Sequence, residues 1–283
     1  MEPTIVSVAS ADGHRAGLVL HEAAAARAGL LWLPAMGVPA RKYSRFAGAL
    51  AERGVATALH EWRGGGTSDW RAARDRDWGY AELLADVAAS REALARRDPA
   101  IAWRIGGHSL GAQLAALAHA REPSRYAGLA IVGAGLPYWR SFPGWQQPLL
   151  LAVFAWFRLL VAALGYFPGD TVGFAGREAR RVIHDWSRSG LAGRYRIAGD
   201  ALDHDAALAS LETPVFAVRF AHDRYVPAGS LDALLARMPR AAVARHALGA
   251  ARFAQGRADH FAWMRDTDPV VHLLADWATR GPG

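Results

Sequence analysis

The segment IAWRIGGHSLGAQLAALAHA, residues 101–120, decides the fold. Its apolar first part, 101–106, predicts a buried strand, and 109–120, rich in Ala and Leu, predicts a helix. The turn between them, Gly107-His108-Ser109-Leu110-Gly111, fits the pattern G-x-S-x-G. Such a turn strains the serine backbone and lifts its hydroxyl off the sheet, and the glycines avoid contact with the neighbouring strand or helix. Ser109 is therefore the candidate nucleophile; the alternative is an ordinary glycine-rich turn.

Strand and helix patterns alternate on both sides of this segment. The expected strands are 4–9, 15–21, 29–33, 55–59, 126–132, 214–220 and 241–246, and the expected helices are 43–53, 80–97, 230–237 and 269–279. Short connections between alternating elements imply a mostly parallel sheet flanked by helices. Residues 137–199 interrupt the alternation, with clustered aromatic residues and no clean strand. We therefore expect one α/β domain, built from 1–136 and 200–283, with an insertion at 137–199.

The composition excludes several classes of protein. The 283 residues include no Cys, which rules out disulfide scaffolds, thiolate metal sites and Cys nucleophiles. A hydrophobic fraction of 52% argues against disorder. The net charge is +7, but residues 71–77, RAARDRD, alternate in sign and no nucleic-acid motif is present. Nucleic acid is therefore not an expected partner.

The targeting signals indicate a cytoplasmic protein. The N-terminus has no cationic segment followed by an apolar core, so no signal peptide is expected. The most apolar run, LLLAVFAWFRLLVAAL at 149–164, has 16 residues and includes Arg158, whereas a membrane span needs about 20. This run predicts a helix that is buried or lies on a surface. Its exposed part is a candidate for peripheral contact with lipid.

A serine hydroxyl needs a base, and His260 is the best candidate among the 11 His residues. It lies in Ala258-Asp259-His260-Phe261, between the last expected strand and the final helix. His246 ends a strand and His272 lies within the final helix, so both are weaker candidates. His108 adjoins the serine but is expected to point away from it across the turn.

Asp223 is the best candidate for the carboxylate that orients the base. It follows the strand at 214–220, at the sheet edge where sites form, and Ser109, Asp223, His260 is the chain order that this type of turn accompanies. Asp203 and Asp205 precede the strand, and Asp259 is better placed to support the His260 loop. The alternatives for Asp223 are a carboxylate that caps its own loop or one that pairs with Arg224.

An acyl-transfer site also needs two N–H donors for the developing oxyanion. The residue after the nucleophile, Leu110, supplies one. The other is expected from the loop after the early buried strand, where Met36 lies between Ala35 and Gly37. The alternative for Met36 is an apolar residue that fills a gap.

These residues together resemble the α/β-hydrolase superfamily of serine hydrolases, and more narrowly a bacterial group of α/β hydrolases of undefined substrate. The shared segments are PAMGVPARKY at 34–43, EWRGGGTSD at 61–69, GHSLG at 107–111, GYFPGDTVG at 165–173, Asp185-Trp186, HDRYVP at 222–227 and DHFAWMR at 259–265. The resemblance implies an α/β-hydrolase fold with Ser109 as nucleophile, Asp223 as acid, His260 as base, and Met36 and Leu110 as oxyanion donors. It implies no cofactor and no metal. Many relatives carry His-Gly where this chain has Pro34-Ala35.

The resemblance also implies that 137–199 forms a mainly helical cap over Ser109. The segment holds 12 of the 28 aromatic residues and eight Arg against three acids. Trp139, Trp145, Trp156 and Phe157 are candidates for lining an apolar acyl pocket; the alternative is that the aromatic residues only hold the cap together. Its cations, among them Arg177, Arg180 and Arg181, are expected to face the entrance.

The sequence therefore predicts a serine hydrolase that cleaves small carboxylic esters or thioesters with apolar acyl groups. An acyltransferase that uses the same three side chains is the second hypothesis. A non-catalytic ligand-binding protein is the third, and the retained Ser, Asp and His in order argue against it. A serine at the turn also argues against dehalogenase or epoxide-hydrolase chemistry, where family members use Asp.

Overall fold

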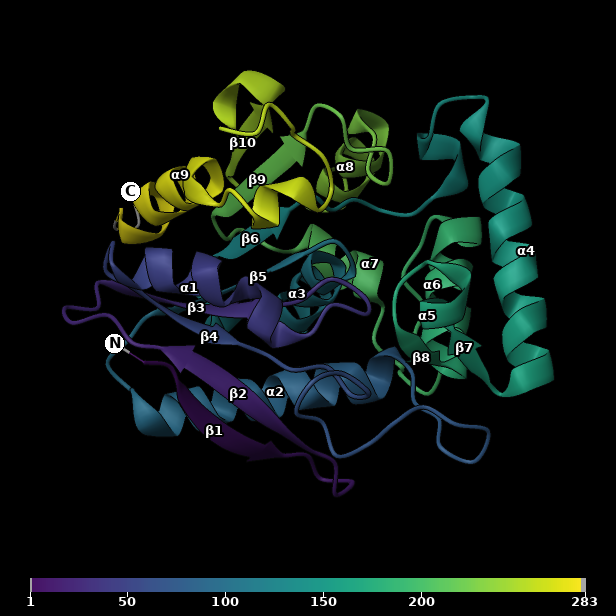
Figure 1. Ribbon diagram of the computed structural model, residues 1–283, viewed down its shortest axis with the longest axis horizontal. Coiled ribbons are helices and arrows are strands. Elements are labelled where there is room, and N and C mark those ends of the chain that lie inside the picture. Colours follow the sequence, from purple (N-terminus) through teal and green to yellow (C-terminus); the bar gives the residue numbers. More distant parts are fainter. Residues whose placement is uncertain (1, 281–283) are drawn as a thin grey trace.

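A computed structural model describes residues 2–280 as an eight-stranded sheet between two layers of helices, with a helical insertion at one end (Figure 1). The strand order is β1-β2-β4-β3-β5-β6-β9-β10. The strands are β1 (Thr4–Ala9), β2 (Arg15–His21), β3 (Ala28–Leu33), β4 (Val55–Leu59), β5 (Trp103–His108), β6 (Leu129–Val132), β9 (Val215–Phe220) and β10 (Val243–Leu248). Only β2 runs antiparallel to its neighbours β1 and β4 within this sheet. The predicted α/β-hydrolase fold with a mostly parallel sheet is confirmed.

Helices cover both faces of the sheet. Phe46 of α1 (Ser44–Ala51) and Leu274 of α9 (Asp268–Thr279) belong to the core on one face. The other face carries α2 (Tyr80–Arg97), α3 (Leu110–Arg121), α7 (His204–Ala209) and α8 (Ala228–Leu235). Short 3-10 helices occupy Ala40–Tyr43, Pro123–Arg125, Trp139–Ser141, Ala250–Arg252 and Ala262–Met264. The helix expected at 43–53 is thus preceded by a 3-10 turn at Ala40–Tyr43 and begins at Ser44.

The insertion lies between β6 and β9 and contains α4 (Gln146–Leu164), α5 (Gly169–Val172) and α6 (Arg180–Ala192). The expectation that it contains no strand is wrong, because β7 (Tyr166–Pro168) and β8 (Arg177–Ala179) form an antiparallel pair. Three-residue strands are too short to show alternation in a sequence. The α4 helix is also longer than the 16-residue apolar run, and it ends where Gly165 adopts a left-handed conformation (φ 83°).

Polar contacts join the insertion to the N-terminal end of α2. The Asp185 carboxylate accepts the Tyr80 N–H at 2.9 Å, and the Arg181 guanidinium donates to Glu82 at 2.5 Å. Asp185 thereby serves one of the N–H groups that the start of a helix leaves without an intrahelical acceptor. These contacts fix the base of the insertion on the core.

Candidate active site

The turn between β5 and α3 holds Ser109 in a conformation that L-residues rarely adopt, with φ 56° and ψ −123°. A Cβ on Gly107 would meet the carbonyl carbon of Gly111 at 2.5 Å, and one on Gly111 would meet the Leu33 carbonyl oxygen at 2.1 Å. The predicted crowding on both sides of the serine is therefore present. The serine hydroxyl projects from the carboxyl end of β5, at the start of a helix.

The three side chains predicted from the sequence lie in one hydrogen-bonded chain. Ser109 Oγ is 3.0 Å from His260 Nε2, and His260 Nδ1 is 2.7 Å from Asp223 Oδ2. The other Asp223 oxygen accepts the backbone N–H groups of Tyr225 and Val226 at 2.8 and 3.0 Å. The carboxylate therefore both caps its own loop and orients the imidazole, while Arg224 is exposed and forms no ion pair with it.

The competing residues serve other purposes. Asp203 caps α7, and Asp259 accepts the Phe261 and Ala262 N–H groups of the His260 loop, as expected for that carboxylate. His246 packs on the ring of Phe216, and Asp205 pairs with Arg237. His272 is exposed beside Asp276. None of these side chains is hydrogen-bonded to Ser109, His260 or Asp223.

His108 turns away from Ser109 and supports the base from behind. Its Nδ1 is 2.9 Å from the Tyr43 hydroxyl, its Nε2 accepts from Trp263 Nε1 at 3.5 Å, and its ring centre is 4.7 Å from that of His260. Complete burial, and next the neighbouring His260, hold the pKa of His108 well below its usual range. A neutral ring therefore packs against the imidazole of His260.

The two predicted oxyanion donors have N–H groups without an acceptor among residues 2–280. Leu110 N is at the first position of α3, and Met36 follows β3 in a loop that is fixed by the Ala35 N–H bond to the Tyr43 hydroxyl. The insertion touches this loop: Gly37 has φ +71°, and a Cβ there would meet Gly176 N at 1.9 Å. With Pro34-Ala35 at this point of the loop, the backbone N–H groups of Met36 and Leu110 are therefore free to receive an oxyanion.

Ser109 opens into a pocket of about 590 Å³ between the core and the insertion. Trp145, Trp156 and Phe157 line it, as predicted, together with Met36 and Leu110. Trp139 does not; its ring lies against Tyr138 and the Arg140 guanidinium. Sequence reasoning missed Phe174, Trp186, Tyr225 and Phe261, although the last three lie within segments on which the family resemblance rests.

The charges near the pocket differ from the expectation. Arg180 and Arg181 pair with Asp77 and Glu82 of the core, and Arg177 donates to the Ala72 carbonyl. The prediction that these three cations face the entrance is therefore wrong, because core acceptors hold them. Arg224 lines the pocket instead, and the described lining includes no Asp or Glu. No group of three or more His, Asp or Glu side chains in residues 2–280 is placed to hold a metal ion.

Residues 24–263 match the family described as serine aminopeptidase, S33. The chain belongs to this family of α/β hydrolases. A search of curated proteins gave no match. Similar solved structures include an α/β hydrolase, GrgF, from Penicillium sp. sh18 (TM-score 0.67, 16% identity, 99% of each chain) and an esterase domain from Rhodothermus marinus (0.63, 16%, 99% of each). An esterase from Pyrococcus furiosus has a TM-score of 0.64 at 14% identity, over 100% of this chain and 92% of that one. At these identities the structures show the fold.

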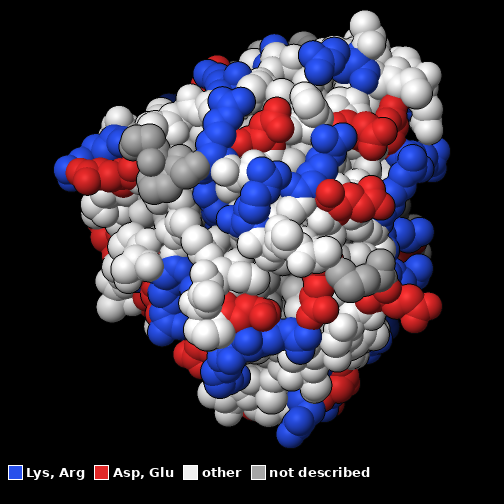
Figure 2. Space-filling model, turned by 90° about the vertical axis from the view of Figure 1, so that its left-hand side faces the viewer, with Lys and Arg blue, Asp and Glu red and all other residues white. Residues whose placement is uncertain are grey.

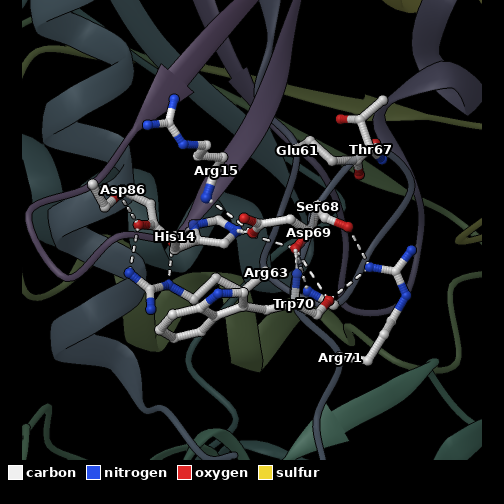
Figure 3. Close-up of polar contacts among 12 residues, drawn as sticks. His14, Arg15, Glu61, Arg63, Thr67, Ser68, Asp69, Trp70, Arg71 and Asp86 are labelled. Atoms are coloured by element: carbon white, nitrogen blue, oxygen red, sulfur yellow. Dashed lines mark hydrogen bonds and ion pairs between the residues drawn. The ribbon is translucent and has the colours of Figure 1, made fainter.

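This hydrolase contains a second Ser, His and Asp contact, which the sequence did not suggest (Figure 3). His14 Nε2 is 3.0 Å from Ser68 Oγ, and His14 Nδ1 is 3.3 Å from Asp86 Oδ2. Arg63 binds both oxygens of the same carboxylate, at 2.5 and 2.7 Å. Burial alone would raise the pKa of Asp86, but hydrogen bonds from His14, Arg63 and Ser10 lower it to about 2.

The surroundings of this second cluster differ from those of Ser109. Ser68 Oγ donates to the Trp70 carbonyl and accepts the Gly64 and Trp70 N–H groups. The adjoining cavity has a volume of about 10 Å³, room for one water at most. The cluster joins the β1–β2 turn to the loop after β4 and to α2, which gives the EWRGGGTSD segment a structural role in the hydrolase.

Proposed function

We propose that the protein is a serine hydrolase that cleaves carboxylic esters or thioesters with apolar acyl groups. The observation that carries this proposal is the position of Ser109 Oγ. It is hydrogen-bonded to His260 and faces a pocket of about 590 Å³ that is lined mainly by apolar side chains, many of them aromatic. A site of this shape favours an apolar acyl chain next to the nucleophile.

In the proposed mechanism Ser109 Oγ attacks the carbonyl carbon while its proton passes to His260 Nε2. Asp223, hydrogen-bonded to Nδ1, stabilises the imidazolium, and the N–H groups of Met36 and Leu110 receive the oxyanion. The imidazolium then protonates the leaving alkoxide or thiolate. Water, deprotonated by His260, attacks the acyl carbonyl, and His260 returns this proton to Ser109 Oγ as the acid leaves.

The pocket favours neutral or anionic substrates. Its described lining has no carboxylate and includes Arg224, so the α-ammonium group of an aminopeptidase substrate would lack a counter-ion. We accordingly assign residues 137–199 as a cap whose aromatic side chains bind the acyl group, with Trp145, Trp156 and Phe157 as substrate-binding residues.

The experiment is labelling with a fluorophosphonate probe, followed by kinetics on p-nitrophenyl esters from acetyl to decanoyl. We expect wild type to label, Ser109→Ala not to label, and kcat/KM to rise with acyl length. Equal labelling of both proteins overturns the mechanism, and a flat chain-length profile overturns the apolar acyl pocket. Product analysis with an added alcohol distinguishes hydrolysis from acyl transfer: free acid as the main product supports a hydrolase, and ester as the main product overturns it.

A further inference from the structure

The exposed apolar side chains of the protein gather around α4 and the mouth of the Ser109 pocket. Of the eleven large hydrophobic residues that are exposed within residues 2–280, five lie on α4 or directly before it and two more line the pocket beside His260. They are Trp145, Leu149, Trp156, Leu159, Leu164, Tyr225 and Phe261. An exposed apolar patch of this extent marks an interaction surface.

The outer face of α4 is apolar along its whole length. Leu149, Ala152, Ala155, Trp156, Leu159, Ala162 and Ala163 follow helical spacing and are all exposed. The opposite face packs on the insertion through Phe154, Phe157 and Val161. Within residues 2–280, α4 is the one helix long and apolar enough to cross a membrane, yet only 17% of its most apolar window is buried. Since its inner face rests on the protein, the helix can lie on a bilayer but does not leave the domain.

The charges of α4 indicate what covers this face. The helix contains no acid, and its single cation, Arg158, is exposed and has no carboxylate partner among residues 2–280. The face of the molecule opposite the insertion is different, because cations and acids alternate there (Figure 2). A second copy packed on α4 would bury Arg158 without a counter-ion, which is costly. A lipid phosphate supplies that counter-ion, because an Arg head extends to the interface while its stem stays apolar.

We propose that α4 docks this hydrolase onto an anionic lipid surface, with Leu159 in the acyl region and Arg158 at the phosphates. Trp145, Tyr225 and Phe261 would then place the pocket mouth against the same surface. An acyl substrate enters the pocket from the lipid without crossing water. The docking of α4 on lipid does not depend on the proposed function. The delivery of an acyl substrate from the lipid to Ser109 rests on that function.

The docking experiment is co-sedimentation with vesicles, carried out in the Ser109→Ala protein so that no turnover occurs. The vesicles are phosphatidylcholine alone or a mixture of about seven parts phosphatidylcholine to three parts phosphatidylglycerol. Leu159→Glu, at a residue that is 70% exposed and outside the pocket lining, should weaken binding to the mixed vesicles about tenfold or more. The matched control is Ile5→Glu on β1, 63% exposed, which should bind as the parent does. Arg158→Gln should weaken binding about fivefold on mixed vesicles only.

Each other outcome overturns the proposal. These outcomes are no binding of the parent protein, equal binding of Leu159→Glu, and equal affinity for both vesicles. Sedimentation velocity tests a second copy as the occupant of α4. If the protein is a dimer that Leu159→Glu dissociates, and if it does not bind vesicles, a second copy covers α4 and the lipid proposal is overturned. In protein with Ser109 intact, Leu159→Glu should slow hydrolysis of a vesicle-embedded ester at least fivefold and leave p-nitrophenyl acetate turnover unchanged. If neither substrate is cleaved while vesicles still bind, the proposed function fails and docking stands.

Discussion

The two Ser, His and Asp clusters of this protein share a hydrogen-bond pattern and differ in everything around it. In each, imidazole Nε2 meets a serine oxygen at 3.0 Å and Nδ1 faces a carboxylate. Ser109 adjoins a pocket of about 590 Å³ and two free N–H groups, whereas Ser68 Oγ is occupied by three backbone contacts. Asp86 is already neutralised by Arg63, while in the described part of the chain Asp223 pairs with no cation except the imidazole of His260 when it is protonated. Access, free N–H donors and an uncommitted carboxylate therefore separate a candidate catalytic site from a structural one.

The largest expected difference between the clusters lies in their serines. Ser109→Ala should lower kcat about 10⁴-fold or more, because the other serine of the pocket lining, Ser230, donates its hydroxyl to the Leu136 carbonyl and is not paired with a base. Ser68→Ala should leave kcat within about threefold and reduce the free energy of unfolding by about 1–3 kcal/mol through its lost hydrogen bonds. Steady-state kinetics and urea unfolding measure both. A comparable loss of kcat in Ser68→Ala would contradict the division of roles.

The carboxylates should divide in the same way as the serines, with a larger effect on stability. Asp86→Asn leaves the buried Arg63 charge without its main partner, so the free energy of unfolding should fall by about 3–5 kcal/mol. Asp223→Asn should cost far less stability and most of the activity, because it removes the acceptor for the proton on His260 Nδ1. Urea unfolding of both variants beside wild type makes the comparison. An Asp86→Asn protein as stable as wild type would show that Arg63 finds another partner.

Alanine substitutions at two glycines with positive φ distinguish the cost of backbone strain from the effect of a displaced oxyanion loop. Gly37→Ala should reduce kcat about 100-fold, because its Cβ would displace Gly176 and the oxyanion loop. Gly13→Ala, beside the second cluster, has φ +92° and nothing within 4 Å of the added Cβ. It should lower only stability, by about 1–2 kcal/mol. Equal kcat values for the two variants would mean that the loop adjusts without loss.

The smallest expected effect is a dependence on pH. The pKa of Asp86 is about 2 in the folded protein against 3.8 as its ordinary value. Its contribution to stability is therefore fully present above about pH 4 and is lost as the pH falls through about 2. The advantage of wild type over Asp86→Asn in free energy of unfolding should shrink by about 2 kcal/mol between pH 5 and pH 2. A constant advantage over this range would argue that Asp86 is not the titrating group.

Sequence patterns predicted the sheet and the Ser109 chain because both follow local rules. Buried strands read as apolar runs, and the order Ser109, Asp223, His260 follows from where the strands end. The prediction that Trp139 lines the pocket was wrong because aromatic content does not indicate the direction in which a ring points. The prediction that Arg180 and Arg181 face the entrance was wrong because their partners, Asp77 and Glu82, lie about a hundred residues away in the sequence. The contact of His14 with Ser68 and Asp86 was not predicted because these residues are also far apart in the sequence.

The backbone contact between Gly37 and Gly176 has a consequence for protein engineering. A foreign insertion grafted to change the substrate range of such an enzyme would be chosen for its acyl pocket. Here the graft would also remove the backbone that packs on the loop bearing the Met36 N–H. A productive chimera must therefore keep the 173–178 segment with its recipient core, or transfer the 34–38 loop together with the donor insertion.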